Sequence, residues 1–294
     1  MPIQSGTSSR SVGTTWMYAG TLLIAGFVLF LYRDVFYRMA GDWYNYSNDS
    51  HGFLVPLLSA YFIWERWDVL IKEKIAPSLW GAGVLCFGLF CLSIGLVGTI
   101  LYLQRLSFLM VLAGLVLLIL GRRHLEILSF PIGFLLFMIP LPDLVVNTIA
   151  LPLQLFAAKT ASFCLFSLGI PVLREGNLII LASTTLEVAE ACSGLRSLLA
   201  LLALGTVYGY FSQNIVWKRW VLVVLSVPIA IVANGVRVSG TGILAHYFGV
   251  EAAEGFYHTF EGWIVFVVAF VLLFFCGTIL GKIGSRSMNT PSSV

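Results

Sequence analysis

The chain has 294 residues, of which 59% are hydrophobic and only 11% are charged, and its formal net charge is +3. Soluble domains carry about 25% charged residues, and a soluble chain of this length lacks the polar surface to cover so much apolar side chain. The composition therefore excludes a soluble enzyme, a disordered chain and a disulfide-stapled secreted domain, and the scattered basic residues argue against nucleic-acid binding. It predicts an all-α integral membrane protein with the lipid bilayer as its solvent.

Eight segments are apolar enough to predict membrane-spanning helices, which need about 20 residues each. They lie near Trp16–Tyr32, Gly52–Trp64, Trp80–Leu103, Leu106–Leu120, Leu125–Ile139, Leu195–Phe211, Trp220–Val236 and Trp263–Leu280. The second, fourth and fifth have short uncharged cores. Residues 1–15 and 282–294 are expected to be cytoplasmic tails on either side of one membrane domain at 16–281.

The segment between the fifth and sixth spans has a different pattern. Leu144–Leu168 is apolar enough to cross, but four residues interrupt it: Asn147, Pro152, Gln154 and Lys159. This composition favours a helix that lies along the interface or enters the membrane only shallowly. Further on, Leu178–Leu181 and Leu186–Glu190 flank a polar turn and predict a β-hairpin. Such backbone cannot face lipid, so the hairpin is expected outside the membrane or in a wet cleft.

Lysine and arginine residues are distributed unevenly between the two sides of this membrane domain. With the N-terminus inside, the inner side carries ten basic and four acidic residues, and the outer side carries seven basic and ten acidic residues. Cytoplasmic loops carry the excess of positive charge, so a net +6 inside and −3 outside supports eight spans. A ninth span at 144–168 would move Lys218 and Arg219 to the outer side. The hairpin and Cys192 are therefore expected on the outer face.

Cys192 follows the predicted hairpin and opens the sixth span. The positive end of a helix dipole favours a thiolate at this position. Arg196 is four residues further on, so we expect it on the same helix face, pointing into a polar cleft. In the alternative interpretation, Cys192 is a small packing residue and Arg196 pairs with Glu187 or Glu190.

Two further motifs fall at the outer ends of predicted spans. Asn234 and Arg237 are three residues apart at the end of the seventh span and share a helix face, and Pro228 upstream could kink that helix. The alternative is an interfacial arginine that reaches up to lipid phosphate. His258, in Glu254-Gly-Phe-Tyr-His258, leads into the last span and can exchange a proton near neutral pH.

The alternative for His258 is a histidine in a surface loop. His246 is its competitor, although its neighbours Ala245 and Tyr247 offer no obvious partner. The role of His51 is left open.

Cysteine, arginine and histidine at one membrane depth supply a nucleophile, a group that holds an oxyanion and a group that moves a proton. Acyl transfer from a peptide is the reaction class that these roles indicate. Glu187, Glu190 and Glu254 are candidates for orienting them. Neither the serine motif Gly-x-Ser-x-Gly nor the zinc motif His-Glu-x-x-His occurs, and no cofactor or metal is indicated.

At these residues the chain resembles the exosortase family of the exosortase/archaeosortase group. The matching stretches are EVAEACSGLRSL at Glu187–Leu198, NGVRV at Asn234–Val238, GFYHTFEG at Gly255–Gly262, and DSHGFLVPL at Asp49–Leu57 continuing to Tyr61–Trp64. The likeness covers about residues 40–280. The order of the three motifs is specific, although each motif alone would be weak.

The resemblance implies a multi-pass cysteine transpeptidase or protease of the bacterial inner membrane, with its active site on the periplasmic face. Such proteins recognise exported proteins by a C-terminal sorting signal (PEP-CTERM): a short Pro-Glu-Pro-like motif, a membrane helix and a basic cluster. The setting is often exopolysaccharide production. The family's catalytic residues correspond to Cys192, Arg237 and His258. Arg196, Asn234 and the three glutamates are the supporting candidates, and the oligomeric state is left open.

Two other functions compete with this interpretation. A transport component for envelope polysaccharide would line a substrate path with its intramembrane arginine and histidine. Against it, the polar groups gather at one face rather than crossing the bilayer. In a non-catalytic membrane scaffold, the change Cys192→Ala would be silent.

Overall fold

The computed structural model describes residues 20, 23–182, 184–188, 194–249 and 256–283, without the side chains of Ser47 and residues 256–262. The chain divides into two compact units. The first comprises residues 1–46 and 52–140, and the second comprises residues 47–51 and 141–294.

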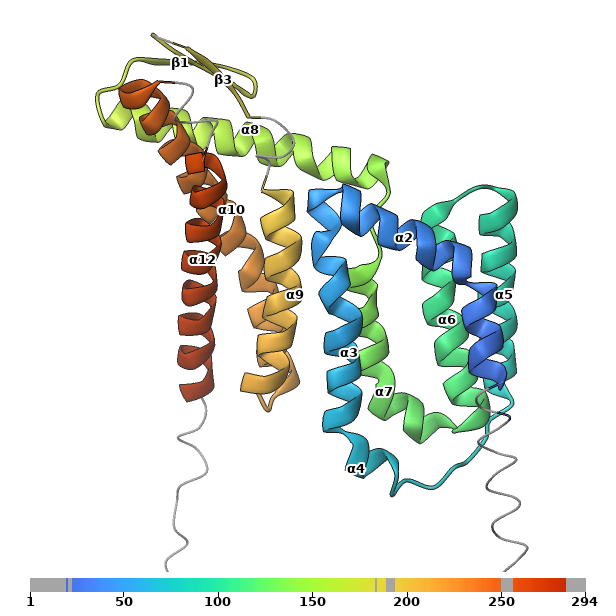
Figure 1. Ribbon diagram of the computed structural model, residues 1–294. Coiled ribbons are helices and arrows are strands. Elements are labelled where there is room, and N and C mark those ends of the chain that lie inside the picture. Colours follow the sequence, from blue (N-terminus) through green and yellow to red (C-terminus); the bar gives the residue numbers. More distant parts are fainter. Residues whose placement is uncertain (1–19, 21–22, 183, 189–193, 250–255, 284–294) are drawn as a thin grey trace, which may run out of the picture. The chain divides into compact units, whose positions relative to one another are not determined.

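The first unit consists, in its described residues, of helices and the loops that connect them. After a helical stretch at 23–31, its elements are α2 (Arg33–Asn45), α3 (Leu54–Glu65), α4 (Trp67–Leu70), α5 (Trp80–Val97), α6 (Leu101–Ile119), α7 (Arg122–Phe134) and the short 3₁₀ helix η2 (Leu135–Met138). Another 3₁₀ helix, η1 (Ser47–Phe53), joins α2 to α3. Figure 1 shows α3, α5, α6 and much of α7 running side by side, with α2 lying crosswise to α3 and α6.

A row of glycines holds α5 and α6 together as an antiparallel pair. Gly81, Gly88 and Gly95 recur every seven residues on α5 and therefore share one face. A β-carbon on Gly81 would lie 2.2 Å from the Leu118 backbone nitrogen, and one on Gly88 would lie 2.9 Å from that of Val111. Only glycine allows this close approach, which is a common way for helices to associate in lipid.

A buried ion pair ties α2 to α6. Arg105 is 5% exposed and forms an ion pair and a hydrogen bond with the carboxylate of Asp42. Gln104, the neighbour of Arg105 on α6, donates its side-chain N–H to the carbonyl of Gly95 on α5 at 2.7 Å. This bond also holds α5 against α6. Tyr32, at the start of α2, shares a 2.9 Å hydrogen bond with Ser107. These polar groups are buried with partners, as an apolar surrounding requires.

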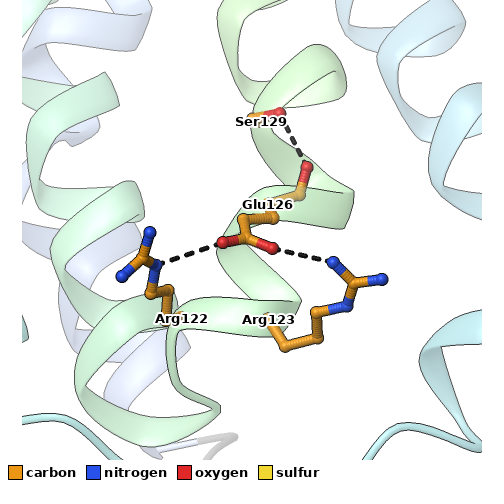
Figure 2. Close-up of polar contacts among 4 residues, drawn as sticks. All are labelled: Arg122, Arg123, Glu126 and Ser129. Carbon is orange, nitrogen blue, oxygen red and sulfur yellow. Dashed lines mark hydrogen bonds and ion pairs between the residues drawn. The ribbon is translucent and has the colours of Figure 1, made fainter.

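The first turn of α7 carries an exposed charged cluster (Figure 2). Glu126 accepts a hydrogen bond from Arg122 Nε at 3.1 Å and another from Arg123 Nη1 at 2.9 Å, and Ser129 donates to its backbone carbonyl. Both arginine side chains are more than 60% exposed. Such groups cannot lie in hydrocarbon, so α7 begins at a membrane surface.

Within its described residues, the second unit contains four long helices and a small sheet. Its elements are α8 (Asp143–Ser167), β1 (Val172–Glu175), β2 (Leu178–Leu181), β3 (Thr185–Glu187), α9 (Leu195–Ser212), α10 (Val216–Phe248) and α12 (Phe256–Lys282). In Figure 1, α8 lies crosswise to α9 and α12.

The predicted hairpin is present as β2 and β3, and β1 adds a third antiparallel strand in the order β1–β2–β3. Leu178 pairs with both Glu175 and Glu187. The additional strand was missed because Val172–Glu175 is too short to show alternation. The Gly176-Asn177 turn that joins it to β2 was the available signal.

Small side chains let α8 pack closely against the second half of α10. Ala157, Ala158 and Ala161 are at most 2% exposed. A β-carbon on Gly235 of α10 would lie 3.1 Å from the side chain of Thr160. These residues share one hydrophobic cluster with the inner face of the sheet, so α8, the sheet and the end of α10 form one packed body.

Polar contacts join α9, α10 and α12 near the end of the bundle opposite the sheet. Gln213, which follows α9, donates to the Gly277 carbonyl of α12 at 2.9 Å. Lys218 of α10 is 5% exposed and donates to the Ile283 carbonyl at 2.5 Å. These contacts fix how the three helices run toward the candidate site.

Six of the described helices are long and apolar enough to cross a membrane: α5, α6, α8, α9, α10 and the part of α12 from Trp263. They expose large apolar side chains, such as Trp80 at 84%, which is expected where lipid is the solvent. The all-α membrane class is confirmed, and the chain is a multi-pass membrane protein.

The predicted count of eight spans is not confirmed. The predicted spans at 52–64 and 125–139 are helical, but α3 has 12 residues and α7 has 13 before η2 continues it. The predicted first span lies partly outside the described residues. The predicted interfacial segment is one continuous 25-residue helix, α8, and its length and composition alone would allow it to cross.

Candidate functional site

The helix after the predicted nucleophile begins later than expected. α9 starts at Leu195, and its N-cap Gly194 has a left-handed backbone with φ +82°. Because Cys192 precedes the first helical residue, the prediction that it shares a helix face with Arg196 falls outside the described residues. Arg196 lies in the first turn of α9 and is exposed rather than directed into a cleft. Cys192 itself lies outside the described residues.

Asn234 of α10 packs directly onto the start of α9. Its side chain is 5% exposed, and a β-carbon on Gly194 would lie 2.6 Å from Asn234 Cγ. Gly194 lies two residues after Cys192 in the chain. The structure thus brings the Asn234–Arg237 motif to the segment that follows the cysteine, although some forty residues separate them in sequence.

The Asn234–Arg237 motif lies inside a helix rather than at its end, which corrects the predicted span at 220–236. α10 runs for 33 residues, through Pro228 and the motif, and ends at Phe248 before Gly249. At 1.5 Å per residue it is roughly 50 Å long, more than the ~30 Å hydrocarbon core. It continues because Asn234 and Gly235 pack against Gly194 and Thr160 instead of breaking the helix.

A small cleft opens where α9, α10 and α12 meet. Its lining is Ser197, Leu201, Ala230, Ala233, Asn234, Arg237, Val265, Phe266 and Ala269. Asn234 and Arg237 both line it, which confirms that they share a helix face. The cleft has room for about one water molecule.

Of the nine residues that line this cleft, Arg237 carries a charge. The side chain is half-buried, its Nε atom is fully buried, and its backbone carbonyl accepts a hydrogen bond from Thr241 at 3.1 Å. Six of the nine lining residues are apolar aliphatic or aromatic, so the guanidinium lies beside a low-dielectric surface. Electrostatic interactions are stronger in such surroundings than in water.

Ser197 was not singled out from the sequence. Its hydroxyl-bearing side chain lines the cleft together with Asn234 and Arg237, one turn into α9. The available signal was a polar residue at the start of an apolar span, three positions after a Ser-Gly pair. Serines are common in membrane helices, so this signal alone carries little weight.

α12 contains position 258 in its first turn. The side chain of His258 lies outside the described part of the structure, as does Glu254. Val265, seven residues after His258 and two helical turns away, lines the cleft. Positions seven apart fall nearly on one line of an α-helix, so position 258 is on the α12 face that borders the cleft.

The other candidates are dispersed. Glu187 is exposed at the end of β3, and Glu190 lies outside the described residues. His246, in the last turn of α10, packs edge-on against Tyr247 and is absent from the cleft lining. The ring of His51 contacts the Asn48 carbonyl at 3.2 Å. Within the described ranges, no three His, Cys, Asp or Glu residues gather in a metal-binding group.

Comparison with known proteins assigns the chain to a family. A family model for transmembrane exosortases (Exosortase_EpsH) matches residues 43–275, which is more than half of the chain and includes Cys192, Arg237 and His258. No curated protein and no solved structure matches the sequence. The match agrees with the multi-pass membrane architecture described above. The chain therefore belongs to the transmembrane exosortase family.

Proposed function

We propose that this chain is a membrane-embedded cysteine transpeptidase that cleaves a C-terminal sorting signal on exported proteins. Exosortases act in general as sorting transpeptidases, and the proposal concerns how this one works. Cys192 is the nucleophile, Arg237 holds the oxyanion and His258 moves the proton. Asn234 positions the segment after Cys192, whereas Arg196, Glu187, Glu190 and Glu254 have supporting roles around the site.

The contact between Asn234 and Gly194 carries this proposal. A β-carbon on Gly194 would lie 2.6 Å from Asn234 Cγ. The start of α9 and α10 therefore leave no space for a side chain at position 194. Arg237 lies one turn further along α10 on the same face. Only Ser193 lies between Gly194 and Cys192 in the chain, which is a reach of roughly 7 Å. Such proximity is what a nucleophile and an oxyanion-binding group require.

The cleft supports including α12 in the same site. Val265, Phe266 and Ala269 of α12 line it opposite Ser197 and Arg237. Position 258 continues this face of α12 toward its N-terminus. A histidine there would approach the cysteine end of α9 rather than its far end, where the Gln213–Gly277 contact lies.

The reaction begins with attack of the Cys192 thiolate on the scissile peptide carbonyl. The carbon–sulfur bond forms, the carbonyl electron pair becomes an oxyanion, and the Arg237 guanidinium neutralises it. The oxyanion then collapses, the C–N bond breaks, and the imidazolium of His258 gives its proton to the leaving amine. The C-terminal tail departs with a free amino group. Attack by an acceptor amine or water on the thioester breaks the carbon–sulfur bond, releases the exported protein and regenerates the Cys192 thiolate, with His258 accepting the proton of the attacking group.

The substrate and the orientation follow from the family and from charge. We infer a tail of the PEP-CTERM type, in which a short motif precedes an apolar helix and a basic cluster, on proteins connected with exopolysaccharide or envelope biogenesis. In the predicted eight-span arrangement, the net charge of +6 on one side and −3 on the other supports a periplasmic position for the Cys192 end of α9 in an inner membrane. A membrane-impermeant thiol reagent should label Cys192 in intact spheroplasts. Labelling seen only after lysis would reverse the orientation.

The experiment that tests the function is C-terminal processing of a reporter. The chain is co-expressed with an exported domain that ends in such a tripartite tail, and a gel follows the loss of the tail. Cys192→Ala and Cys192→Ser should both abolish processing while membrane levels stay normal. Cys164→Ala, which removes another thiol of the same unit, is the matched control and should process normally. Full processing by Cys192→Ala would refute a cysteine mechanism.

A further inference from the structure

Strand β3 forms one edge of the sheet and leads directly to Cys192. It pairs with β2 on one side, and no other described strand pairs with it on the other. Glu187 ends the strand five residues before Cys192. An extended chain covers at most about 17 Å over five residues, which sets the upper limit of the distance between the end of the strand and the proposed nucleophile.

The backbone hydrogen bonds show which groups of β3 face its open edge. In an antiparallel pair, residues alternate between those whose N–H and C=O groups bond the partner and those whose groups point away. Leu181 donates its N–H to the Thr184 carbonyl at 2.7 Å, and Val188 donates to the Asn177 carbonyl at 3.0 Å. Positions 184, 186 and 188 therefore face β2.

Thr185 and Glu187 consequently direct their backbone N–H and C=O groups toward the open edge. Both residues are exposed. Among the described residues, none bonds to these outward groups. Unpaired edge groups of this kind are a ready template for another strand.

The edge is held firmly in relation to the candidate site. The inner face of the sheet, through Ile179 and Val188, belongs to the same hydrophobic cluster as Val238 of α10. Val238 is the neighbour of Arg237 in the chain. The edge of β3 and the Arg237 segment are thus parts of one packed body.

We propose that the open edge of β3 binds the substrate as a fourth strand, taking the extended segment that precedes the cleavage site. The inference rests on the proposed function and adds the mode of substrate binding to it. Main-chain hydrogen bonds would supply affinity with little dependence on sequence, as in other cases of strand addition. A substrate strand parallel to β3 runs, from its N- to its C-terminal end, from Thr185 past Glu187 toward the cysteine segment. The other edge strand, β1, has four residues and does not lead to the cysteine.

Disulfide scanning tests the binding mode directly. Thr185→Cys is placed in the full-length membrane-bound chain together with Cys192→Ala, which prevents turnover. The reporter with the tripartite tail carries one cysteine at successive positions before its apolar helix. Disulfides should form at alternate positions, because side chains of a bound strand repeat every two residues. Arg174→Cys on β1 is the control and should form none.

Proline substitution gives a second, functional measurement. Thr185→Pro removes one outward N–H without removing a bond to β2, and Arg174→Pro does the same on β1. The loss of one substrate hydrogen bond should slow processing about five- to tenfold in Thr185→Pro. Arg174→Pro should process at the normal rate, with equal membrane levels for both variants.

These outcomes separate the binding mode from the function. Disulfides at consecutive positions, at no position, or only between two copies of the chain would overturn strand addition. So would normal processing by Thr185→Pro, even if Cys192→Ala remains inactive. Processing by Cys192→Ala would instead overturn the proposed function.

Discussion

Asn234 of α10 lies so close to Gly194, the N-cap of α9, that a β-carbon on the glycine would fall 2.6 Å from Asn234 Cγ and 2.9 Å from Nδ2. Gly194 also has φ +82°, a conformation that side chains disfavour. Position 194 therefore requires glycine for two separate reasons, the left-handed backbone and the close contact with Asn234. Both arise at the point where the chain passes from the cysteine segment into a membrane helix.

Gly194→Ala should be more harmful than Gly169→Ala. Gly169 has a similar φ of +80°, but nothing lies within 4 Å of its β-carbon position. Both variants incur left-handed strain of roughly 1–2 kcal/mol, and only Gly194→Ala also displaces Asn234. Thermal unfolding in detergent and reporter processing are the measurements. Equal losses in the two variants would show that the Asn234 contact is unimportant.

Loss of one member of the Arg105–Asp42 ion pair should destabilise the first unit strongly. Arg105→Ala removes a buried side chain and leaves the partly exposed Asp42 carboxylate without its partner, which should cost about 3 kcal/mol, measured by denaturation of the purified protein. The double variant with Asp42→Ala should lose less than the sum of the single variants. Glu126→Gln, which breaks the exposed pairs drawn in Figure 2, is the control and should have no measurable effect. Additive losses in the double variant would contradict a direct interaction.

Arg237→Lys should abolish processing even though it keeps the positive charge. Lysine is a point charge without the planar fork that holds an oxyanion in a fixed geometry. Membrane levels should stay normal, because the side chain is only half-buried. Arg196→Lys, in the exposed first turn of α9, is the matched variant and should retain most activity. Normal processing by Arg237→Lys would reduce Arg237 to a lipid anchor.

His258→Ala should stop turnover but leave Cys192 open to alkylation at neutral pH. The helix N-terminus and Arg237 still favour the thiolate, whereas no fixed cation can protonate the leaving amine. His246→Ala should resemble the wild type, since His246 is absent from the cleft lining. Reporter processing and the rate of alkylation are measured in parallel. Loss of processing in His246→Ala alone would mean that the wrong histidine has been assigned.

The sequence was sufficient to predict the membrane class, the helices that became α9, α10 and α12, and the β2–β3 hairpin. Each of these rests on a local pattern, a long apolar run or an alternation. The pairing of Asn234 with Arg237 on one face also followed from spacing alone. The length of α10 could not be predicted from spacing. Asn234 and Gly235 are tolerated inside this helix because they contact Gly194 and Thr160, which are distant in sequence.

The span count is not confirmed, because short and interrupted segments decide it. Pro152 and Lys159 favoured an interfacial or shallow helix, and α8 is a continuous helix through both, in which the hydroxyls of Thr148 and Thr160 bond back to carbonyls four residues earlier. The prediction that Arg196 shares a helix face with Cys192 stays a prediction, because α9 begins at Leu195 and Cys192 lies outside the described residues. Ser197 was overlooked because its position in the cleft depends on how three helices meet.

The covalent state of Cys192 during turnover is the most direct test of the account. The full-length chain in its membrane is mixed with the tripartite-tail reporter, quenched in acid and analysed by mass spectrometry. We predict a hydroxylamine-sensitive thioester on Cys192 that carries the reporter truncated at its cleavage site, present in Cys164→Ala and missing in Cys192→Ala. Efficient processing without an adduct on Cys192, or with the adduct on another residue, would contradict the account.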